Sequence, residues 1–530
     1  MNCQHPLYRE PEKCLVRETY LTSAIAMLTT DRDASFMLNP DEVLATYKHA
    51  IGVLVKYHKL PTGMLEDTET FIPFENWLAP HRASTKMEPR SIKVLLLGGP
   101  SPSNDIEVLV AHGIFPQNIW TVESNSDCYR SAVEDIKRLN FNVKIYNGEL
   151  SEFLQKNQKF FDLVYLDACG SFCAGKPNTL LPIMELVANN RLSSLSVLIT
   201  NFAEVKDGKN EYADILASYF MGRYNDYPKE SWALGIDPAE LCYDGNKLKQ
   251  IIADNFEMFY SDFVTRFITD ITRFLIPACS AMSFRYIQEK VIDKKWIGSV
   301  LKEYAYKESF DNIKVPEDWQ HLSEKVFDRD LNPSSYALYT FFKYLRKLCN
   351  QNPLVDSLFG FSLKGRRLGE LLPVVSSMNA IVEGHWKMVS MDFLKQVLGI
   401  WYDEEGGLFC DLPLPNLLIN SHLGFFRHPH HVNVRKTRRL SYCAKNTRMF
   451  MDCFVLDNCS EYYDWFPSLD LTNAFFKDIR NQLLARSMLD RLGRNDWSSS
   501  SHPFRGSAMI SFGDSPLAEA YEFGDRQYIN

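Results

Sequence analysis

The sequence lacks the closely spaced cysteine pairs that build a disulfide scaffold or a zinc ribbon. Its 12 cysteines are scattered from Cys3 to Cys459 along a chain of 530 residues. This distribution is typical of reduced thiols buried in a large globular protein. No metal site is expected, because the one dense histidine cluster, His428 to His431, has no carboxylate or cysteine partner at ligand spacing.

A long uncharged hydrophobic run is also missing. The most apolar long segment, residues 256–276, contains five charged side chains: Glu257, Asp262, Arg266, Asp270 and Arg273. Burying each of them in lipid would cost about 2.5–3.5 kcal/mol, so no membrane span is expected there. The first residues also lack the positive and apolar regions of a secretory signal, and we therefore expect a cytoplasmic protein.

Neither sign of charge dominates the composition. The chain has 58 basic and 66 acidic residues, for a formal net charge of −8. With 45% hydrophobic and 23% charged residues it is a globular rather than a disordered or fibrous protein. Its length predicts about two or three folding units.

Residues 91–228 alternate short apolar runs with helix-length amphipathic segments. The predicted strands are 94–97, 119–123, 142–146, 161–167 and 195–200, and the predicted helices are 104–112, 127–139, 149–156, 178–190 and 210–219. Helical crossovers of this length connect parallel strands. The predicted class is therefore α/β, with a doubly wound Rossmann-like parallel sheet in residues 91–228. A helical segment is expected before it, in residues 1–90, and a large, mostly helical region after it, in residues 229–530.

Small and acidic residues follow four consecutive predicted strands. Gly98, Gly99 and Pro100 follow the first strand, and Glu123 ends the second. Gly148-Glu149 follows the third strand and Asp167 ends the fourth. Because the carboxyl ends of parallel strands share one edge of the sheet, these residues are expected to converge on a ligand site there. Glycines would let a ligand approach the backbone, and a carboxylate about 25 residues further on suits a ribose diol.

This order of features resembles the class I S-adenosylmethionine-dependent methyltransferases. The resemblance implies that Gly98 and Gly99 line the methionine moiety, that Glu123 binds the ribose and that Glu149 lies near the adenine. Asp167 would then face the sulfonium or the nucleophile. The implied cofactor site consists of Gly98, Gly99, Pro100, Glu123, Ser124, Gly148, Glu149 and Asp167. The chain departs from the family pattern where Pro100 and Pro102 replace later glycines of the loop.

Each of these residues also has a purely structural interpretation. Gly98-Gly99 is compatible with a simple tight turn, and Glu123 or Asp167 with a charge that stabilises the start of the next helix. Cys169 is a candidate catalytic thiol beside Asp167, since a thiol near a helix start has a lowered pKa, but a cysteine in such a position is more often a small buried side chain.

A basic segment, residues 412–451, interrupts the otherwise mixed charge of the carboxy-terminal region. It contains no Asp or Glu and seven Lys or Arg, with Phe425, Phe426 and Tyr442 between them. Basic side chains interleaved with aromatic ones suit binding to phosphates and stacking on bases. The residues predicted to contact RNA or DNA are Arg427, Arg435, Lys436, Arg438 and Arg439. A basic face docked on acidic protein surface is the alternative.

Two functions remain open at this level. The first is an S-adenosylmethionine-dependent methyltransferase whose helical half selects the acceptor, with RNA or DNA as the leading acceptor class and Asp167 as the positioning group or base. The second is a non-catalytic binding or scaffold protein with a degenerate methyltransferase-like domain, because a fold does not by itself imply a function.

Overall fold

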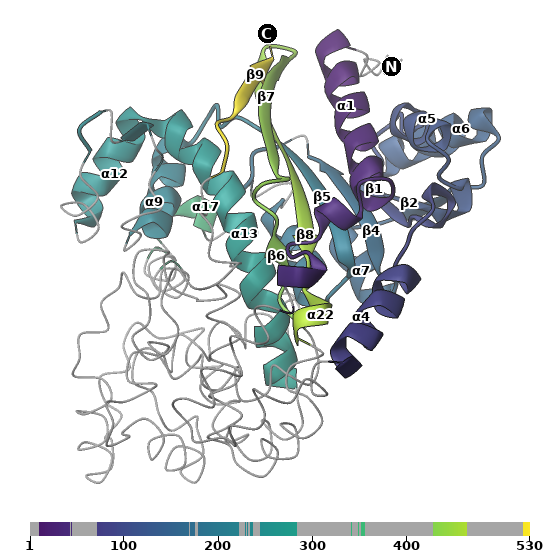
Figure 1. Ribbon diagram of the computed structural model, residues 1–530. Helices are drawn as coiled ribbons and strands as arrows, with labels where there is room; N and C mark the ends of the chain where they lie inside the picture. The colour runs from purple at the N-terminus through teal and green to yellow at the C-terminus, as the bar shows by residue number, and fades with distance from the viewer. Residues whose placement is uncertain are drawn as a thin grey trace, which may run out of the picture.

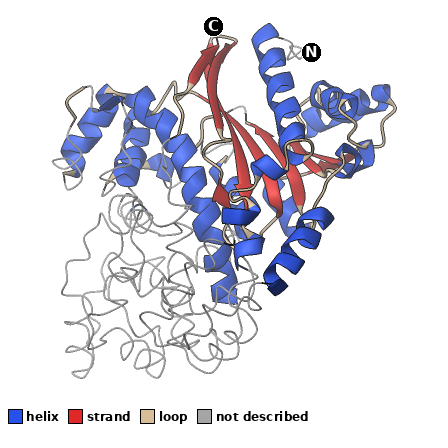
Figure 2. Ribbon diagram, viewed as in Figure 1, coloured by secondary structure: helices blue, strands red, loops and turns tan. Residues whose placement is uncertain are grey.

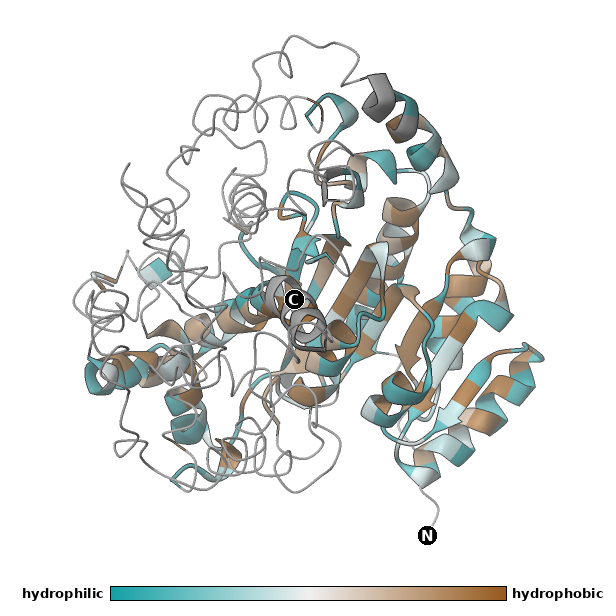
Figure 3. Cartoon of the chain, turned by 90° about the horizontal axis from the view of Figure 1, so that it is seen from below, coloured by the Kyte–Doolittle hydropathy of each residue, from teal (hydrophilic) through white to brown (hydrophobic). Residues whose placement is uncertain are grey.

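The computed structural model describes residues 10–42, 44, 72–168, 170–174, 179–221, 228, 230–231, 234–236, 244–283, 341, 348, 351–355, 428–463 and 523–529. These residues form one nine-stranded mixed sheet with helices on both faces (Figures 1 and 2). Figure 3 shows hydrophobic residues concentrated on the strands of this sheet. Among the described helices, none combines the length and the apolar character needed to cross a membrane.

Five parallel strands build the first half of the sheet, and they confirm the predicted α/β class. Their spatial order is β3-β2-β1-β4-β5, the order of a doubly wound fold. Neighbours pair in parallel throughout this half. The strands are β1 (Val94–Leu97), β2 (Ile119–Glu123), β3 (Lys144–Asn147), β4 (Phe161–Asp167) and β5 (Leu192–Ala203).

Helices cover both faces of the sheet because each strand alternates its apolar side chains between two cores. On one face α1 (Pro11–Leu28), α5 (Ser103–Ala111) and α6 (Ser126–Leu139) pack against residues such as Leu96 and Tyr165. On the other face Leu95 and Val164 pack in the core with the remaining large helices. These are α7 (Leu150–Lys156), α8 (Leu180–Ala188), α9 (Lys209–Phe220), α12 (Gly245–Asp254) and α13 (Phe256–Ser283).

The second half of the sheet comes from the carboxy-terminal region and was not foreseen from the sequence. It contains β6 (His431–Val432), β7 (Arg438–Ala444), β8 (Thr447–Asp457) and β9 (Gln527–Ile529). Strand β8 pairs antiparallel with β5 from Leu195 to Ala203, so the basic segment contributes strands to the same sheet as β1–β5. The basic residues obscured the alternation of Leu440 and Tyr442 with polar neighbours, and a partner strand over two hundred residues away leaves no local signal.

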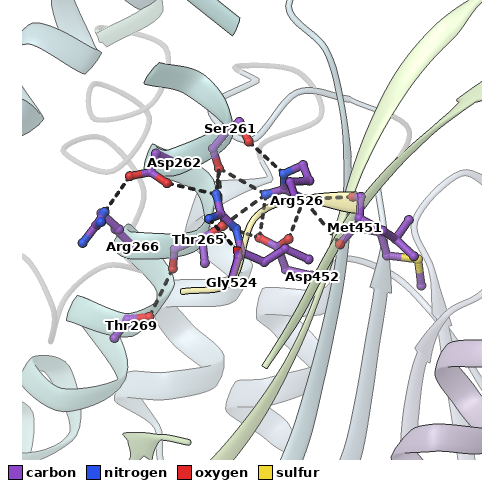
Figure 4. Close-up of polar contacts among 11 residues, drawn as sticks. Ser261, Asp262, Thr265, Arg266, Thr269, Met451, Asp452, Gly524 and Arg526 are labelled. Carbon is purple, nitrogen blue, oxygen red and sulfur yellow. Dashed lines mark hydrogen bonds and ion pairs between the residues drawn. The ribbon is translucent and has the colours of Figure 1, made fainter. Parts of the chain in front are cut away.

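The last described segment is fixed to the sheet by a buried arginine. Arg526 precedes β9 and donates to Asp452 Oδ1 of β8 at 2.6 Å, to Ser261 Oγ of α13 at 2.7 Å and to the Leu440 carbonyl at 2.9 Å (Figure 4). Asp452 also accepts from Thr265 Oγ1 at 2.7 Å. The segment therefore joins β7, β8 and α13 through one charge network inside the protein.

The amino-terminal segment is helical where the structure describes it. Asn39 and Glu42 form the reciprocal cap expected for the helix that begins beside Pro40: the Asn39 N–H donates to Glu42 Oε2 at 2.8 Å and the Glu42 N–H to Asn39 Oδ1 at 2.9 Å. Helix α4 (Ile72–Ser84) precedes β1. Helix α1 packs across β4, β5, β7 and β8, which places its first turn beside the carboxyl edge of the sheet (Figure 1).

Candidate functional site

The predicted ligand residues meet along the carboxyl edge of β3, β2, β1 and β4, which are neighbours in that order. Gly98 follows β1, Glu123 ends β2, Gly148 follows β3 and Asp167 ends β4. Cross-strand hydrogen bonds extend into the loops, since the Gly98 N–H donates to the Val122 carbonyl and the Gly148 N–H to the Glu123 carbonyl, both at 2.9 Å. The edge is thus one continuous surface.

The two glycines of the first loop have different roles. A Cβ on Gly98 would lie 2.7 Å from Thr121 Oγ1, so this glycine is needed for the close approach of β1 and β2. Gly99 has a φ of +54°, and within the described parts of the chain no atom beyond its sequence neighbours lies within 4 Å of the position that a Cβ would take. Its left-handed conformation makes the turn, and the open space before it is available to a ligand.

The start of α5 is unsuited to binding a phosphate. Pro100 and Pro102 have no N–H to offer an anion, and the Ser103 N–H donates to Asp135 Oδ2 of α6 at 2.8 Å. Asp135 is itself buried. A dinucleotide places its pyrophosphate at this helix start in doubly wound folds, and here a carboxylate already occupies that position.

The acids on β2 and beside β3 are accessible. Glu123 is half-buried, and its Oε1 accepts from the Asn125 N–H at 2.7 Å. Ser124 and Glu149 are exposed. Gly148 has a φ of +151°, and a Cβ there would lie 2.8 Å from the ring of Tyr146, so this glycine is required by local packing. Glu123 is therefore held in place by the backbone with its carboxylate at the open edge.

Asp167, at the end of β4, is half-buried, with its side chain 17% exposed. Asn201, its register partner on β5, donates from Nδ2 to Asp167 Oδ1 at 2.7 Å and to the Tyr442 hydroxyl at 2.8 Å. Lys13 Nζ of α1 lies 2.8 Å from Asp167 Oδ2. Burial disfavours the charged form of Lys13, but the attraction and the hydrogen bond of Asp167, with smaller contributions from Tyr442 and Asp105, together raise the pKa of Lys13 above its ordinary value.

A second ion pair lies next to the first. Arg17, one helical turn after Lys13, pairs with Asp105 of α5 at 2.5 Å. Burial raises the pKa of the Asp105 carboxyl to about 6, although Arg17 opposes this shift, and Asp167 adds to it. Helix α1 thus inserts two cations between two acids, one from β4 and one from α5, beside the predicted cofactor loop.

Sequence reasoning missed Lys13, Asn201 and Tyr442 as parts of this site. They come from three segments far apart in the chain, and the sheet brings them together. Of the three, only Asn201 had a signal in the sequence, because it is a polar residue just after the mostly apolar run Leu195–Ile199. In the structure it is fully buried.

The residues predicted to contact nucleic acid do not join this edge. Arg439 is buried, with its side chain 9% exposed, and donates to Asp262 Oδ1 at 3.0 Å, so it is not available to phosphates. Arg435 and Lys436 lie in the turn between β6 and β7, and Arg438 begins β7. Strand β7 ends at the carboxyl edge about 20 Å further on, at about 3.3 Å per residue.

Two candidates, Cys169 and Arg427, lie outside the described residues. Of the histidine cluster, His430 is buried, with Nε2 3.0 Å from the Ser193 carbonyl, and burial lowers its pKa to about 4. No group of His, Cys, Asp and Glu in the described parts of the chain has a geometry that could hold a metal ion.

Comparison with known proteins yields only distant likenesses of fold. No family model and no curated protein matches the chain. A Staphylococcus aureus protein assigned as a caffeoyl-CoA O-methyltransferase is 15% identical, with 39% of this chain covering 88% of that one and a TM-score of 0.17. MtNAS, solved in complex with MTA and tNA, is also 15% identical, with 36% of this chain covering 72% of that one and a TM-score of 0.17. Neither likeness bears on the chemistry of this edge.

Proposed function

We propose that the chain binds S-adenosylmethionine at the carboxyl edge of β1–β4 and transfers its methyl group. The observation that carries the proposal is the pairing of the open turn at Gly99 with the backbone-held carboxylate of Glu123 on the neighbouring strand. The turn leaves space for the amino-acid part of the cofactor, and the carboxylate suits the two ribose hydroxyls. Asp167, beside them on β4, is the proposed positioning group for the acceptor.

The charge of the edge supports this ligand over a nucleotide with phosphates. Asp135 occupies the helix start that a pyrophosphate would need, and Glu123 adds a negative charge, whereas Asp105 and Asp167 are paired with Arg17 and Lys13. A nucleoside with a cationic sulfonium suits such surroundings, whereas a phosphate would be repelled. When bound, the cofactor supplies an electrophilic methyl group, and the residues of the chain orient the acceptor toward it.

Thermal unfolding with several ligands tests this preference. At a hundredfold excess over its dissociation constant, S-adenosylmethionine is expected to stabilise the protein by about 2.7 kcal/mol. NAD and ATP at the same concentration are expected to leave the unfolding temperature unchanged. Equal stabilisation by NAD, or none by S-adenosylmethionine and its demethylated product, would overturn the proposal.

The ion pair between Lys13 and Asp167 favours a second candidate, a non-catalytic binding protein. In this structure the carboxylate proposed to position the acceptor is already neutralised by the chain itself. Under this second candidate the protein binds the cofactor or its product but transfers no methyl group to any acceptor. Release of the demethylated product during incubation with amine, RNA and protein acceptors would show methyl transfer and exclude the second candidate. No release with any of them would favour it.

RNA or DNA as the acceptor stays a prediction of the sequence. The geometry supplies no support for it, because the Arg439 side chain is only 9% exposed and pairs with Asp262, and Arg435 and Arg438 lie before or at the start of β7, away from the proposed methyl-transfer edge. We therefore expect the residues around Asp167, and not the basic segment, to select the acceptor.

A further inference from the structure

A lysine ammonium is enclosed at the edge where the proposed acceptor would lie. Lys13 Nζ contacts Asp167 Oδ2 at 2.8 Å, and the two side chains are only 10% and 17% exposed. Asp167 pairs with the ammonium, Asn201 donates to Asp167 and to Tyr442, and we call these three residues the ammonium subsite. All three belong to strands, whereas the occupant belongs to α1.

The ammonium subsite is preorganised without its occupant. Asn201 Nδ2 donates to Asp167 Oδ1 at 2.7 Å, which fixes the plane of the carboxylate and leaves Oδ2 directed to a further donor. A carboxylate cannot donate, so the amide of Asn201 must present its nitrogen to Asp167. The same nitrogen donates to the Tyr442 hydroxyl at 2.8 Å, which anchors Asn201 from β7.

One acceptor in the ammonium subsite has no hydrogen-bond partner in the described parts of the chain. Asn201 is fully buried, and its Oδ1 receives no hydrogen bond there. Buried carbonyl oxygens are normally satisfied by a donor. An ammonium group offers three N–H donors, of which Asp167 Oδ2 uses one, so a ligand amine has a donor to spare for this oxygen.

The charge balance also calls for a cation. Arg17 pairs with Asp105, and Lys13 with Asp167. If Lys13 withdrew, the enclosed Asp167 would lack its cation and would face the charge of Asp105 nearby. A half-buried carboxylate without a partner is costly, so withdrawal requires another cation to enter.

Lys13 is also placed so that it can leave. It lies in the first turn of α1, before Val16, Tyr20 and Leu21, the first residues that anchor the helix in the apolar core. Pro11 and Leu15 in the same turns are exposed. Displacing the first turn therefore breaks the ion pair of Lys13, and the contact of Glu10 with Lys445 at 3.8 Å, without moving these core residues.

We propose that the ammonium subsite binds the alkylammonium group of a small amine acceptor, and that Lys13 occupies it as an internal mimic until that acceptor arrives. Transfer to that nitrogen would require the ammonium to give one proton to Asp167, so that its lone pair could form the N–C bond as the S–C bond of the cofactor breaks and leaves its electron pair on sulfur. That the bound amine is the methyl acceptor rests on the proposed methyl transfer. The subsite itself depends only on Asp167, Asn201 and Tyr442. Binding of an amine can therefore be measured without the cofactor.

The direct test uses Lys13→Ala with n-butylamine as the probe, because its ammonium on a four-carbon chain has the shape of a lysine side chain and is one carbon longer than the part that alanine removes. We expect n-butylamine to raise the unfolding temperature of Lys13→Ala in a saturable manner, and n-butanol or sodium chloride at equal concentration to have no such effect. Lys13→Met is the matched control, since methionine fills the path of the lysine chain and is expected to show no rescue.

If n-butylamine binds in the ammonium subsite, the rise in the unfolding temperature of Lys13→Ala depends on Asp167. In Lys13→Ala/Asp167→Asn the affinity for n-butylamine is expected to fall at least about tenfold, the effect of losing a hydrogen bond to a charged group. Equal rescue in this double variant or in Lys13→Met would overturn the inference. If S-adenosylmethionine fails to bind while the amine still rescues Lys13→Ala, the proposed function fails and the ammonium subsite stands.

A measurement on the unaltered protein covers the case in which Lys13→Ala does not fold. Acetylation of Lys13 by acetic anhydride, followed by mass spectrometry, reports whether the ammonium is enclosed. N,N-dimethylbutylamine, a cation that forms no stable amide, is expected to increase labelling of Lys13 with rising concentration, while Lys206 is labelled as before. Constant labelling of Lys13 would contradict displacement.

Discussion

At the scale of single residues, the carboxyl edge separates glycines and acids that hold the fold from those that face a ligand. Gly98 and Gly148 are required by close neighbours, Thr121 and Tyr146, whereas Gly99 faces open space. The sequence predicted where these residues gather but not which of them are structural. That distinction depends on distances across strands, which no local pattern contains.

Gly99→Ala is expected to abolish cofactor binding with a small loss of stability. Alanine at a φ of +54° costs about 1 kcal/mol, and its methyl group would enter the proposed ligand space. Gly235→Ala is a matched control, because Gly235 has a φ of +69° and is also free of neighbours within 4 Å. Calorimetric titration should show normal binding in the control and none in Gly99→Ala, and equal binding in both would contradict the role of the turn.

Asp105 is expected to make stability fall as the pH rises from about 4 to 6. Burial raises the pKa of its carboxyl to about 6, so the folded state holds a proton that the unfolded chain has already released, and stability is lost as the pH rises through the folded value. Denaturant unfolding across this window gives the slope of the unfolding free energy against pH. In Asp105→Asn this slope should be less negative than in the unaltered protein, by the equivalent of up to about one proton. Identical slopes would show that Arg17 compensates the buried charge fully.

At the scale of helices and strands, the first half of the sheet could be predicted because each element carries its own signal. Strands β1, β2 and β4 begin and end at the predicted residues, and helix α6 begins within one. Strands β6–β9 escaped prediction because their register depends on contacts with β5 and with each other. Edge and closing strands are defined by their neighbours more than by their own composition.

Arg526→Met tests whether the last strand is held by charge. The substitution leaves Asp452 buried without its cation and is expected to cost about 3–5 kcal/mol. Arg439→Met is the matched control and is expected to cost clearly less, because Asp262 keeps its ion pair with Arg266 at 2.7 Å. Hydrogen exchange of Leu440 to Tyr442, which pair with β9, should accelerate in Arg526→Met, and unchanged exchange would show that β9 docks independently of this network.

At the scale of the whole molecule, the sheet separates the proposed site from part of the basic segment. The carboxyl edge collects the proposed cofactor residues and the ammonium subsite, whereas Arg435, Lys436 and Arg438 lie before or at the start of β7, away from that edge. The basic segment is continuous along the chain, but β7 runs through it, so that Lys445 lies at the carboxyl edge and Arg435 does not. Charge composition alone has no information about which end of a strand a residue occupies.

The triple variant Arg435→Ala/Lys436→Ala/Arg438→Ala tests this separation. If the basic segment binds single-stranded RNA, the slope of log affinity against log salt should shrink by about 2, since each phosphate contact contributes about 0.7. Affinity for S-adenosylmethionine should stay within about twofold, because the substitutions lie at the other end of β7. A parallel loss of cofactor affinity would contradict this separation.

The central claim is that Glu123 binds the ribose of S-adenosylmethionine at the carboxyl edge. Isothermal titration of the cofactor into the unaltered protein, Glu123→Ala and Asp127→Ala tests it most directly, since Asp127 is an exposed acid on the next helix, paired with Arg130. We predict measurable binding to the unaltered protein and a loss of affinity of at least about a hundredfold in Glu123→Ala, from two lost charge-assisted hydrogen bonds. Asp127→Ala is expected to bind with unchanged affinity. Absence of binding to the unaltered protein, or equal affinity in Glu123→Ala, would contradict the claim.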